Sequence, residues 1–312
     1  MLTKSPTDTV AAPFDDSFYD VPNQRPAVPI ALPVVSVRNQ QILLQVTDEL
    51  VGGSLPLLCD VDVRVSLSEQ QRGIHMSRIQ SALQGSTGAS LSDHAAAIAG
   101  RVRESQRQEL VEVRLKARAP LVTRTRVSGL PSPDTVEIFA GAVAGPVPRV
   151  SQAVAATNMT ACPCMQGYSL TDLIKETGLS AQDGVELLKR VPIATHSQRG
   201  RVQLGVTAGE LGLLPGCHRL YQALAARTTL TQELLKRLDE YDLVRRVHVT
   251  PQFVEDVVRS VASGVQTLDL DGDHLGELMI EIVAESYESI HGHDILARLE
   301  APASDLVHLA VA

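Results

Sequence analysis

Two thiols flank a proline at Cys162-Pro163-Cys164, directly after the extended apolar segment Arg149–Met159. Pro163 fixes its own φ and biases Cys162 towards an extended conformation, so one sulfur is held in a defined direction. Downstream, the chain supplies imidazoles and carboxylates at His196, Glu288, His291 and His293. A rigid thiol combined with such groups is suited to bind a metal ion or to act as a nucleophile.

A second polar group lies between residues 71 and 78, after an alternating segment. It contains Arg72, His75 and Arg78, and Ser77 with Gln80 has capping-box spacing for a helix that begins there. Free N–H groups at a helix start favour phosphate, and guanidinium groups can chelate its oxygens. The pattern therefore predicts an anion site, with a solvated turn carrying ordinary surface arginines as the alternative.

The elements that must position these residues follow from periodicity. Extended or alternating segments predict strands over residues 30–37, 59–67, 111–117, 136–143, 149–159, 202–206, 278–284 and 294–299. Helical patterns begin near residues 77, 93 and 217, with Thr231 as a cap for a continuation and Thr250-Pro251 as another start. Between Cys164 and His196, Ser169 and Ser180 could each cap a short helix, and Gly178 could end the first. Strand pairs that alternate with helix pairs predict an α+β fold, with antiparallel hairpins and the helices on one face.

Composition limits the classes of protein. Of 312 residues, 44% are hydrophobic and 3% are aromatic, and the formal net charge is −8. These values predict an aliphatic core and oppose a nucleic-acid-binding surface. No apolar run is long enough to span a bilayer, no signal-peptide core follows Lys4, and four cysteines are too few for a secreted framework. A cytoplasmic protein with reduced thiols is expected, and residues 1–29 are predicted to form a flexible arm.

Five motifs then occur in a fixed order along the chain: Arg72–Arg78, Ala161–Cys164, His196–Arg199, Phe253–Asp256 and Glu288–His293. Together they resemble GTP cyclohydrolases of type IB, over roughly residues 30–300. The resemblance implies a tunnelling fold with two tandem ββααββ-like halves, residues 30–146 and 147–312, and an insertion at about residues 165–195. It also implies a homo-oligomer, expected to be a tetramer, with active sites between subunits. The Cys164–His196 segment is longer than expected, so His196 is matched by its motif and not by its spacing.

The resemblance implies that the guanine imidazole ring of GTP is opened, that C8 leaves as formate, and that 7,8-dihydroneopterin triphosphate forms for tetrahydrofolate synthesis. It implies one divalent metal, zinc, manganese or iron, on Cys162, His196 and Glu240. Three protein ligands leave a position for water, whose pKa the metal lowers towards about 7. The alternatives are an archaeal-like enzyme with a cyclic phosphate product, another tunnelling-fold enzyme with a cysteine nucleophile, and a metal-storing or binding protein.

The remaining roles are also carried over by motif. His291 and Glu255 join Cys162 in the predicted catalytic set, with His291 as proton donor or acceptor and His293 in contact with the substrate. Glu288 is expected to accept hydrogen bonds from guanine, because a carboxylate offers two acceptors. The expected triphosphate-binding residues are Arg72, His75, Arg78 and Arg199.

Each of these assignments has a simpler competing interpretation. Cys162 could be an inert buried thiol, and Glu240 a solvated carboxylate. Glu255 could pair with Arg259 at i,i+4 on its helix. Cys164 is interpreted as supporting the ligands or as a redox-sensitive thiol.

Overall fold

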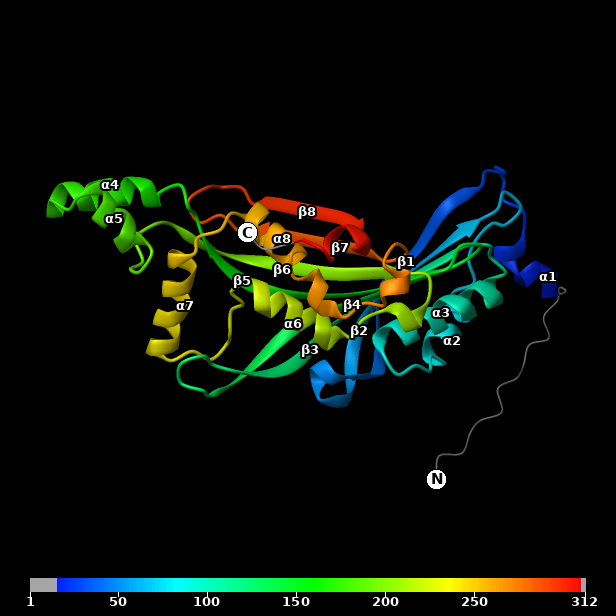
Figure 1. Ribbon diagram of the computed structural model, residues 1–312. Helices are drawn as coiled ribbons and strands as arrows, with labels where there is room; N and C mark the ends of the chain where they lie inside the picture. The colour runs from blue at the N-terminus through cyan, green and yellow to red at the C-terminus, as the bar shows by residue number, and fades with distance from the viewer. Residues whose placement is uncertain (1–15, 310–312) are drawn as a thin grey trace, which may run out of the picture.

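The computed structural model describes residues 16–309, which form a single eight-stranded antiparallel sheet with strand order β1 to β8. Each strand therefore pairs with the strands before and after it in the chain (Figure 1). The strands are β1 (Leu32–Asp48), β2 (Gly53–Leu67), β3 (Val111–Arg124), β4 (Pro131–Ala144), β5 (Arg149–Ala161), β6 (Ser197–Ala208), β7 (Met279–Ser286) and β8 (Ile295–Pro302).

The main helices are inserted between paired strands. The connection from β2 to β3 carries α2 (Met76–Gln84) and α3 (Leu91–Gln106), and the connection from β6 to β7 carries α6 (Cys217–Arg227), α7 (Arg237–Val249) and α8 (Val254–Ala262). A further hairpin, α4 (Gln166–Thr177) and α5 (Ala181–Leu188), lies between β5 and β6, and short helices α1 (Asp16–Tyr19) and α9 (Ala303–Leu306) lie near the ends. Two successive ββααββ units confirm the α+β tunnelling fold expected from the sequence.

The two units share one sheet and one hydrophobic core. Register places Val61, Leu115 and Ala140 side by side, and the same face continues through Val206 and Ile280. Helices α3, α6 and α8 contact this face, and most of the buried apolar residues of the strands lie on it. The division near residue 146 is therefore a repeat boundary within one continuous sheet.

The other face of the sheet carries charges that pair across strands. Arg64 lies 3.4 Å from Glu112, and Glu137 accepts from Lys116 at 2.5 Å and from Arg201 at 2.9 Å. The helix-free face is accordingly polar.

Three helix starts differ from the sequence prediction. The cap of α2 is His75 and not Ser77, because Gln106 hydrogen-bonds both the N–H and the carbonyl of His75. Thr231 caps no helix, because its N–H donates to the Thr157 carbonyl and the segment runs beside β5 until α7 begins at Arg237. Helix α8 begins at Val254, where the Asp256 carboxylate accepts from the Phe253 N–H, and not at Pro251.

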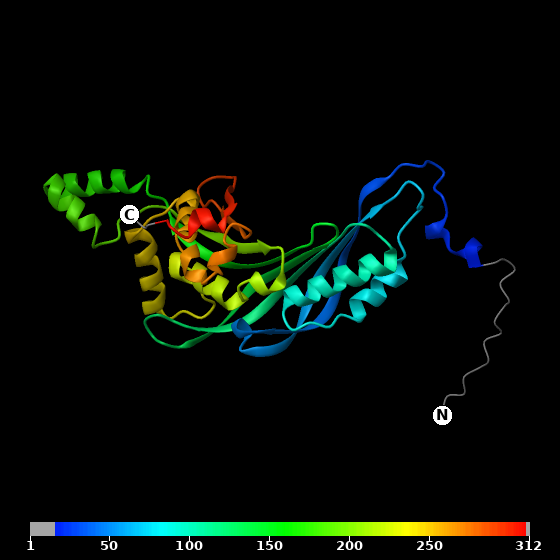
Figure 2. The ribbon, with the colours of Figure 1, turned by 45° about the vertical axis from the view of Figure 1, so that its right-hand side comes forward.

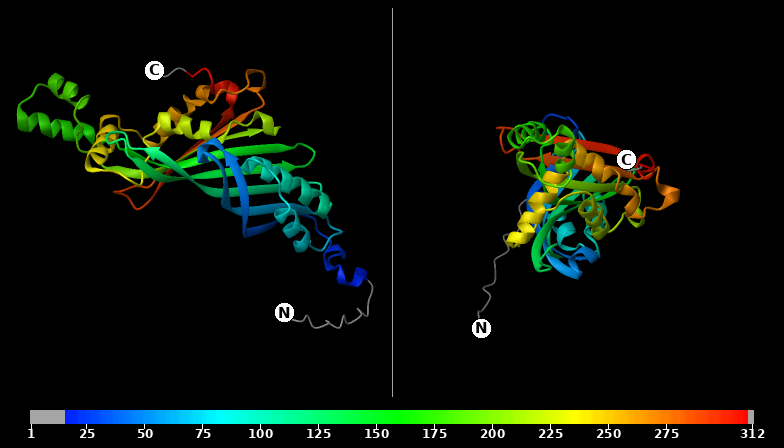
Figure 3. Two further views of the ribbon diagram at one scale, coloured as in Figure 1. Left: turned by 90° about the horizontal axis from the view of Figure 1, so that it is seen from below. Right: turned by 60° about the vertical axis from the view of Figure 1, so that its left-hand side comes forward.

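The α4–α5 hairpin projects from one end of the molecule in Figures 1 and 2 and in the left view of Figure 3. Gly178 ends α4 in a left-handed conformation and Ser180 caps α5, as predicted. Ser169 lies inside α4, where its hydroxyl donates to the Ala194 carbonyl at 2.7 Å. The hairpin is thus tied at its base to the segment that leads into His196.

Part of the segment predicted as a flexible arm is described by the structure. Residues 16–23 form α1 and a 3-10 turn, Val21–Asn23, and the Pro22 carbonyl accepts from the N–H groups of Arg72 and Gly73. Residues 1–15 lie outside the described residues, and for them the flexible arm stays a prediction.

Candidate active site at the ends of β5, β6 and β7

The end of β5 and the beginning of β6 bring Cys162 and His196 together. Strand register pairs Ala161 with Ser197, and the Cys162 N–H donates to the His196 carbonyl at 3.0 Å. The Thr195 hydroxyl donates to the Cys162 carbonyl at 2.7 Å, which fixes the backbone on the other side of the cysteine. Two residues 34 positions apart are therefore neighbours, although the α4–α5 hairpin lies between them in the chain.

The side chains of this pair are suited to a metal ion. Cys162 is 8% exposed, and burial raises the pKa of its thiol. His196 Nδ1 is buried and has no hydrogen-bond partner within residues 16–309, which leaves a lone pair or an N–H to be satisfied. The two possible donors are the sulfur of Cys162, after loss of its proton, and the unpaired imidazole nitrogen of His196. Zinc and similar cations prefer such donors.

Glu240, the third expected ligand, is exposed on the first turn of α7. At the other end of this helix, His248 Nε2 lies 3.3 Å from the Thr195 carbonyl oxygen. Glu240 precedes His248 by eight residues, about 12 Å along a helix axis. Among the described residues, no group of three or more His, Cys, Asp or Glu side chains is placed to hold a metal ion. One chain therefore brings together two of the three expected ligands.

Glu288 follows β7 and is held by two donors. The Ser286 hydroxyl donates to Glu288 Oε1 at 2.8 Å, and Gln198 Nε2 donates to the same oxygen at 3.3 Å and to Ser286 Oγ at 3.2 Å. The register that pairs Gly200 with Ser286 makes these side chains neighbours on the helix-covered face. The close approach requires Gly200, because a Cβ there would overlap the Glu285 carbonyl oxygen and lie 2.8 Å from Asn158 Oδ1.

His291 and His293 lie in the β7–β8 loop, beyond Glu288. Their rings stack with centroids 5.1 Å apart and planes 13° from parallel, and both residues are exposed. The shared orientation expected from their spacing is confirmed, although the segment consists of bends and not of a strand. Two imidazoles are thus exposed to solvent in the loop that follows Glu288.

Glu255 is exposed on α8 and makes no ion pair with Arg259. Arg259 instead pairs with Asp256 at 2.8 Å, at i,i+3. The ion pair with Arg259 that was considered for Glu255 is therefore made by Asp256.

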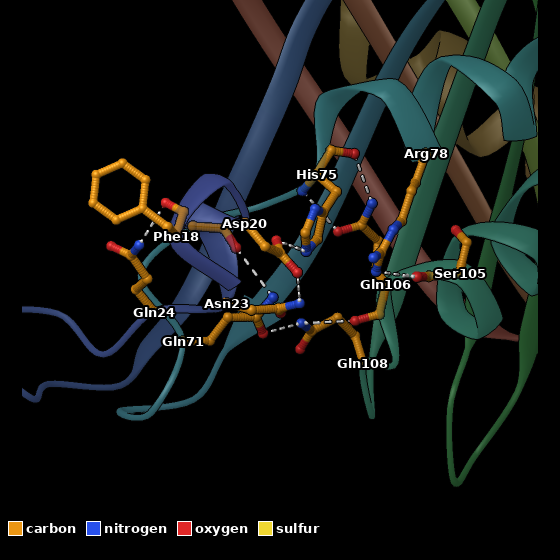
Figure 4. Close-up of polar contacts among 11 residues, drawn as sticks. Phe18, Asp20, Asn23, Gln24, Gln71, His75, Arg78, Ser105, Gln106 and Gln108 are labelled. Carbon is orange, nitrogen blue, oxygen red and sulfur yellow. Dashed lines mark hydrogen bonds and ion pairs between the residues drawn. The ribbon is translucent and has the colours of Figure 1, made fainter. Parts of the chain in front are cut away.

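The predicted anion-binding residues before and within α2 lie far from Cys162. Helices α1, α2 and α3 occupy one end of the molecule, and α4, α5 and α7 the other (Figures 1 and 2). His75 Nε2 lies 3.6 Å from Asp20 Oδ1, and Arg78 donates to the Ser105 carbonyl at 3.1 Å (Figure 4). Arg72 donates to Gln24 Oε1 at 3.4 Å. These residues form a cluster of their own, which one chain does not join to the cysteine site.

Arg199 is near the cysteine site in sequence and position but not in orientation. It is exposed on β6 and follows Gln198, so the alternation of side chains directs it to the helix-free face. The Arg199 carbonyl accepts from the Tyr287 N–H at 2.9 Å.

The sequence analysis missed three residues. Gln198 and Ser286 hold Glu288, and the spacing of Ser286 and Glu288 on alternate positions was a usable signal for a shared face. Asp239 is buried and accepts from Ser128 Oγ at 2.6 Å and from the N–H groups of Val127 and Ser128. Hydrogen bonds from the Ser128 hydroxyl and backbone lower the pKa of Asp239 to about 2. Asp239 thereby fixes the first turn of α7 beside Glu240.

The repeated ββααββ topology is that of a tunnelling-fold protein, and Cys162, His196 and Glu288 follow or precede strands at the same end of its sheet. The chain belongs to the GTP cyclohydrolase family, because residues 18–297 match the family model described as "Type I GTP cyclohydrolase folE2".

Relatives named GTP cyclohydrolase MptA align over nearly the whole chain. The protein of Methanospirillum hungatei is 30% identical over 312 residues, covering 94% of this chain and 93% of its own length. That of Methanoculleus marisnigri is 32% identical, covering 92% and 96%, and that of Haloferax volcanii is 30% identical, covering 92% and 96%. A solved uricase from Bacillus fastidious matches with a TM-score of 0.41 and 8% identity, over 89% of this chain and 94% of that one, a likeness too distant to bear on the chemistry. Within residues 16–309, no helix is both long and apolar enough to cross a membrane.

Proposed function

We propose that the protein is a metal-dependent, type I GTP cyclohydrolase. Water opens the guanine imidazole ring of GTP, C8 leaves as formate, and the remainder recyclises to 7,8-dihydroneopterin triphosphate, the first step of tetrahydrofolate biosynthesis. The observation that carries this proposal is the convergence of Cys162, His196 and Glu288 at the ends of three adjacent strands, in a chain of the GTP cyclohydrolase family.

Cys162 and His196 would hold one divalent metal, zinc, manganese or iron, with Glu240 as the third ligand. When bound, such a metal would supply Lewis-acid chemistry that lowers the pKa of water towards about 7. Because burial raises the pKa of Cys162, metal binding must displace a proton from its thiol. The same burial argues against the alternative of a cysteine nucleophile, which requires a thiolate at neutral pH. Glu240 would complete the set of three ligands if a movement of α7, or a second chain, brought its carboxylate to Cys162 and His196.

The substrate groups are assigned to the residues around the pair. Glu288 accepts hydrogen bonds from guanine, His291 transfers a proton during ring opening, and His293 contacts the substrate. Glu255 assists proton transfer. The support for these roles is the exposure of both stacked imidazoles and of Glu255, and the fixed position of the carboxylate of Glu288.

The triphosphate would be held by Arg72, His75, Arg78 and Arg199 in a homo-oligomer, expected to be a tetramer. The α2 end and the cysteine end of one chain are far apart, so Arg72, His75 and Arg78 of one subunit would reach a nucleotide at the cysteine end of another, where Arg199 of that subunit already lies. The active sites then lie between subunits. A cytoplasmic enzyme without nucleic-acid partners fits the net charge of −8.

A second candidate product is a cyclic phosphate of dihydroneopterin, the alternative that the sequence motifs leave open. Purified protein loaded with Zn²⁺, Mn²⁺ or Fe²⁺ should convert GTP, and mass spectrometry of the pterin distinguishes the linear triphosphate from the cyclic phosphate. Chelation should abolish turnover and added metal should restore it. Full activity in metal-free protein would exclude the proposed mechanism.

A further inference from the structure

We propose that guanine is read by an acceptor pair made of Gln198 Oε1 and Glu288 Oε2, and that Ser286 is the positioning residue for this pair. The proposal rests on the proposed function, because it takes GTP as the ligand. It replaces the simple picture in which both oxygens of Glu288 face the base.

One of the two carboxylate oxygens of Glu288 is already occupied by donors from the protein. Oε1 already accepts from the Ser286 hydroxyl at 2.8 Å and from Gln198 Nε2 at 3.3 Å. Two donors occupy the usual acceptor directions of one carboxylate oxygen. Oε2 is therefore the oxygen of Glu288 that remains for a ligand.

The contacts with Ser286 and Glu288 fix the orientation of the Gln198 amide. Its Nε2 faces both Ser286 Oγ and the carboxylate, so the reverse orientation would place an amide oxygen against a negative charge. The amide oxygen is consequently turned the other way. In that position Gln198 Oε1 is buried and has no hydrogen-bond partner among the described residues. A buried acceptor without a partner is costly, which indicates that a ligand supplies the missing donor.

Guanine supplies two adjacent donors on one edge, the ring N1–H and the exocyclic N2 amine. Glu288 Oε2 would accept from N1–H, and Gln198 Oε1 from the amine. Adenine offers neither donor in this arrangement, and hypoxanthine keeps N1–H but lacks the amine. Gln198 is therefore the residue that distinguishes guanine from hypoxanthine, whereas Ser286 affects both bases equally.

Binding of GTP and of inosine 5′-triphosphate to the metal-loaded protein tests this assignment by calorimetry. The wild-type protein should bind GTP about tenfold more tightly, the ratio expected for one lost hydrogen bond to a buried acceptor. Gln198→Met removes the Nε2 donor from Glu288 for both nucleotides and the Oε1 acceptor for GTP alone, so it should weaken GTP binding about tenfold more than binding of inosine triphosphate. Ser286→Ala should weaken both nucleotides by the same factor, and Ser286→Thr should restore them.

Gln203→Met is the matched control, because Gln203 is half-buried on the same strand, faces the helix-free side and accepts from Arg201 at 3.0 Å. It should change neither affinity. Equal affinity of the wild-type protein for the two nucleotides would overturn the acceptor pair without any variant, as would an equal loss for both in Gln198→Met. Absence of GTP binding to the wild-type protein would overturn the proposed function as well, so the two failures are distinguishable.

Discussion

Replacement of Glu288 by Gln has an outcome that the local hydrogen bonds determine. Ser286 Oγ and Gln198 Nε2 both donate to Oε1, so the new amide must place its oxygen there to accept from them. The amide nitrogen then occupies the position of Oε2 and presents a donor to the guanine N–H. A charge-assisted hydrogen bond is lost and two donors oppose each other.

The expected cost is roughly 2–4 kcal/mol, since hydrogen bonds to charged groups contribute about 1.5–3 kcal/mol and the clash adds to this. This corresponds to a loss of about 30-fold to 1,000-fold in kcat/KM for GTP. Metal content and thermal stability should be unchanged, because Glu288 is half-buried and keeps both of its donors satisfied.

Steady-state GTP turnover, GTP binding and bound metal should be measured on one preparation of Glu288→Gln. Glu285→Gln is a suitable control, because Glu285 is half-buried near the end of β7, on the helix-free face, where it accepts from the Tyr287 hydroxyl. Near-wild-type turnover by Glu288→Gln would refute the guanine contact. Loss of metal with normal GTP binding would instead assign Glu288 to the metal.

Three further changes test other parts of the account. Cys162→Ser should remove the metal, measured by atomic emission, while circular dichroism shows a folded protein; retained metal would exclude Cys162 as a ligand. Guanosine should be a far poorer substrate than GTP, and high salt should raise KM for GTP because the arginine contacts are screened; equal kcat/KM for guanosine would remove Arg72, His75, Arg78 and Arg199 from the site. Asp239→Asn should lower the free energy of unfolding, measured with urea at pH 7. The difference in unfolding free energy from wild type should shrink as pH falls from about 4 towards about 2. In this range the carboxylate is protonated, since its pKa is about 2 in the folded state and about 3.9 in the unfolded state. A difference that is the same at pH 7 and pH 2.5 would contradict the role of the ionised Asp239.

The order of strands and helices was predictable from the sequence because alternation and helical stripes are local. Val61, Val63 and Val65 alternate with charged residues, and this pattern alone places β2 on a half-buried sheet. The helix starts were less predictable, since tertiary contacts decided them. Gln106, 31 residues away, selects His75 as the cap of α2, and pairing with Thr157 keeps Thr231 out of a helix.

The candidate site divides in the same way. The Cys-Pro-Cys and His-Ser-Gln-Arg motifs identified Cys162 and His196, which β5 and β6 bring together. The contacts of Gln198 with Ser286 and Glu288 depend on the register between β6 and β7, which no local pattern encodes. Asp239 was missed because its partners, Val127 and Ser128, are more than 100 positions away. The distance between Arg78 and Cys162 likewise could not be predicted from local patterns, because it depends on how all the strands are arranged in the sheet.

The reaction itself is tested most directly with GTP labelled with ¹³C at C8. The metal-loaded protein is incubated with the labelled nucleotide and the products are followed by ¹³C NMR, with a chelated sample as the control. The account predicts that the label appears in formate and that the unlabelled remainder has the mass of a dihydroneopterin phosphate. Label that stays in a purine or in the pterin product would contradict the proposed cyclohydrolase chemistry.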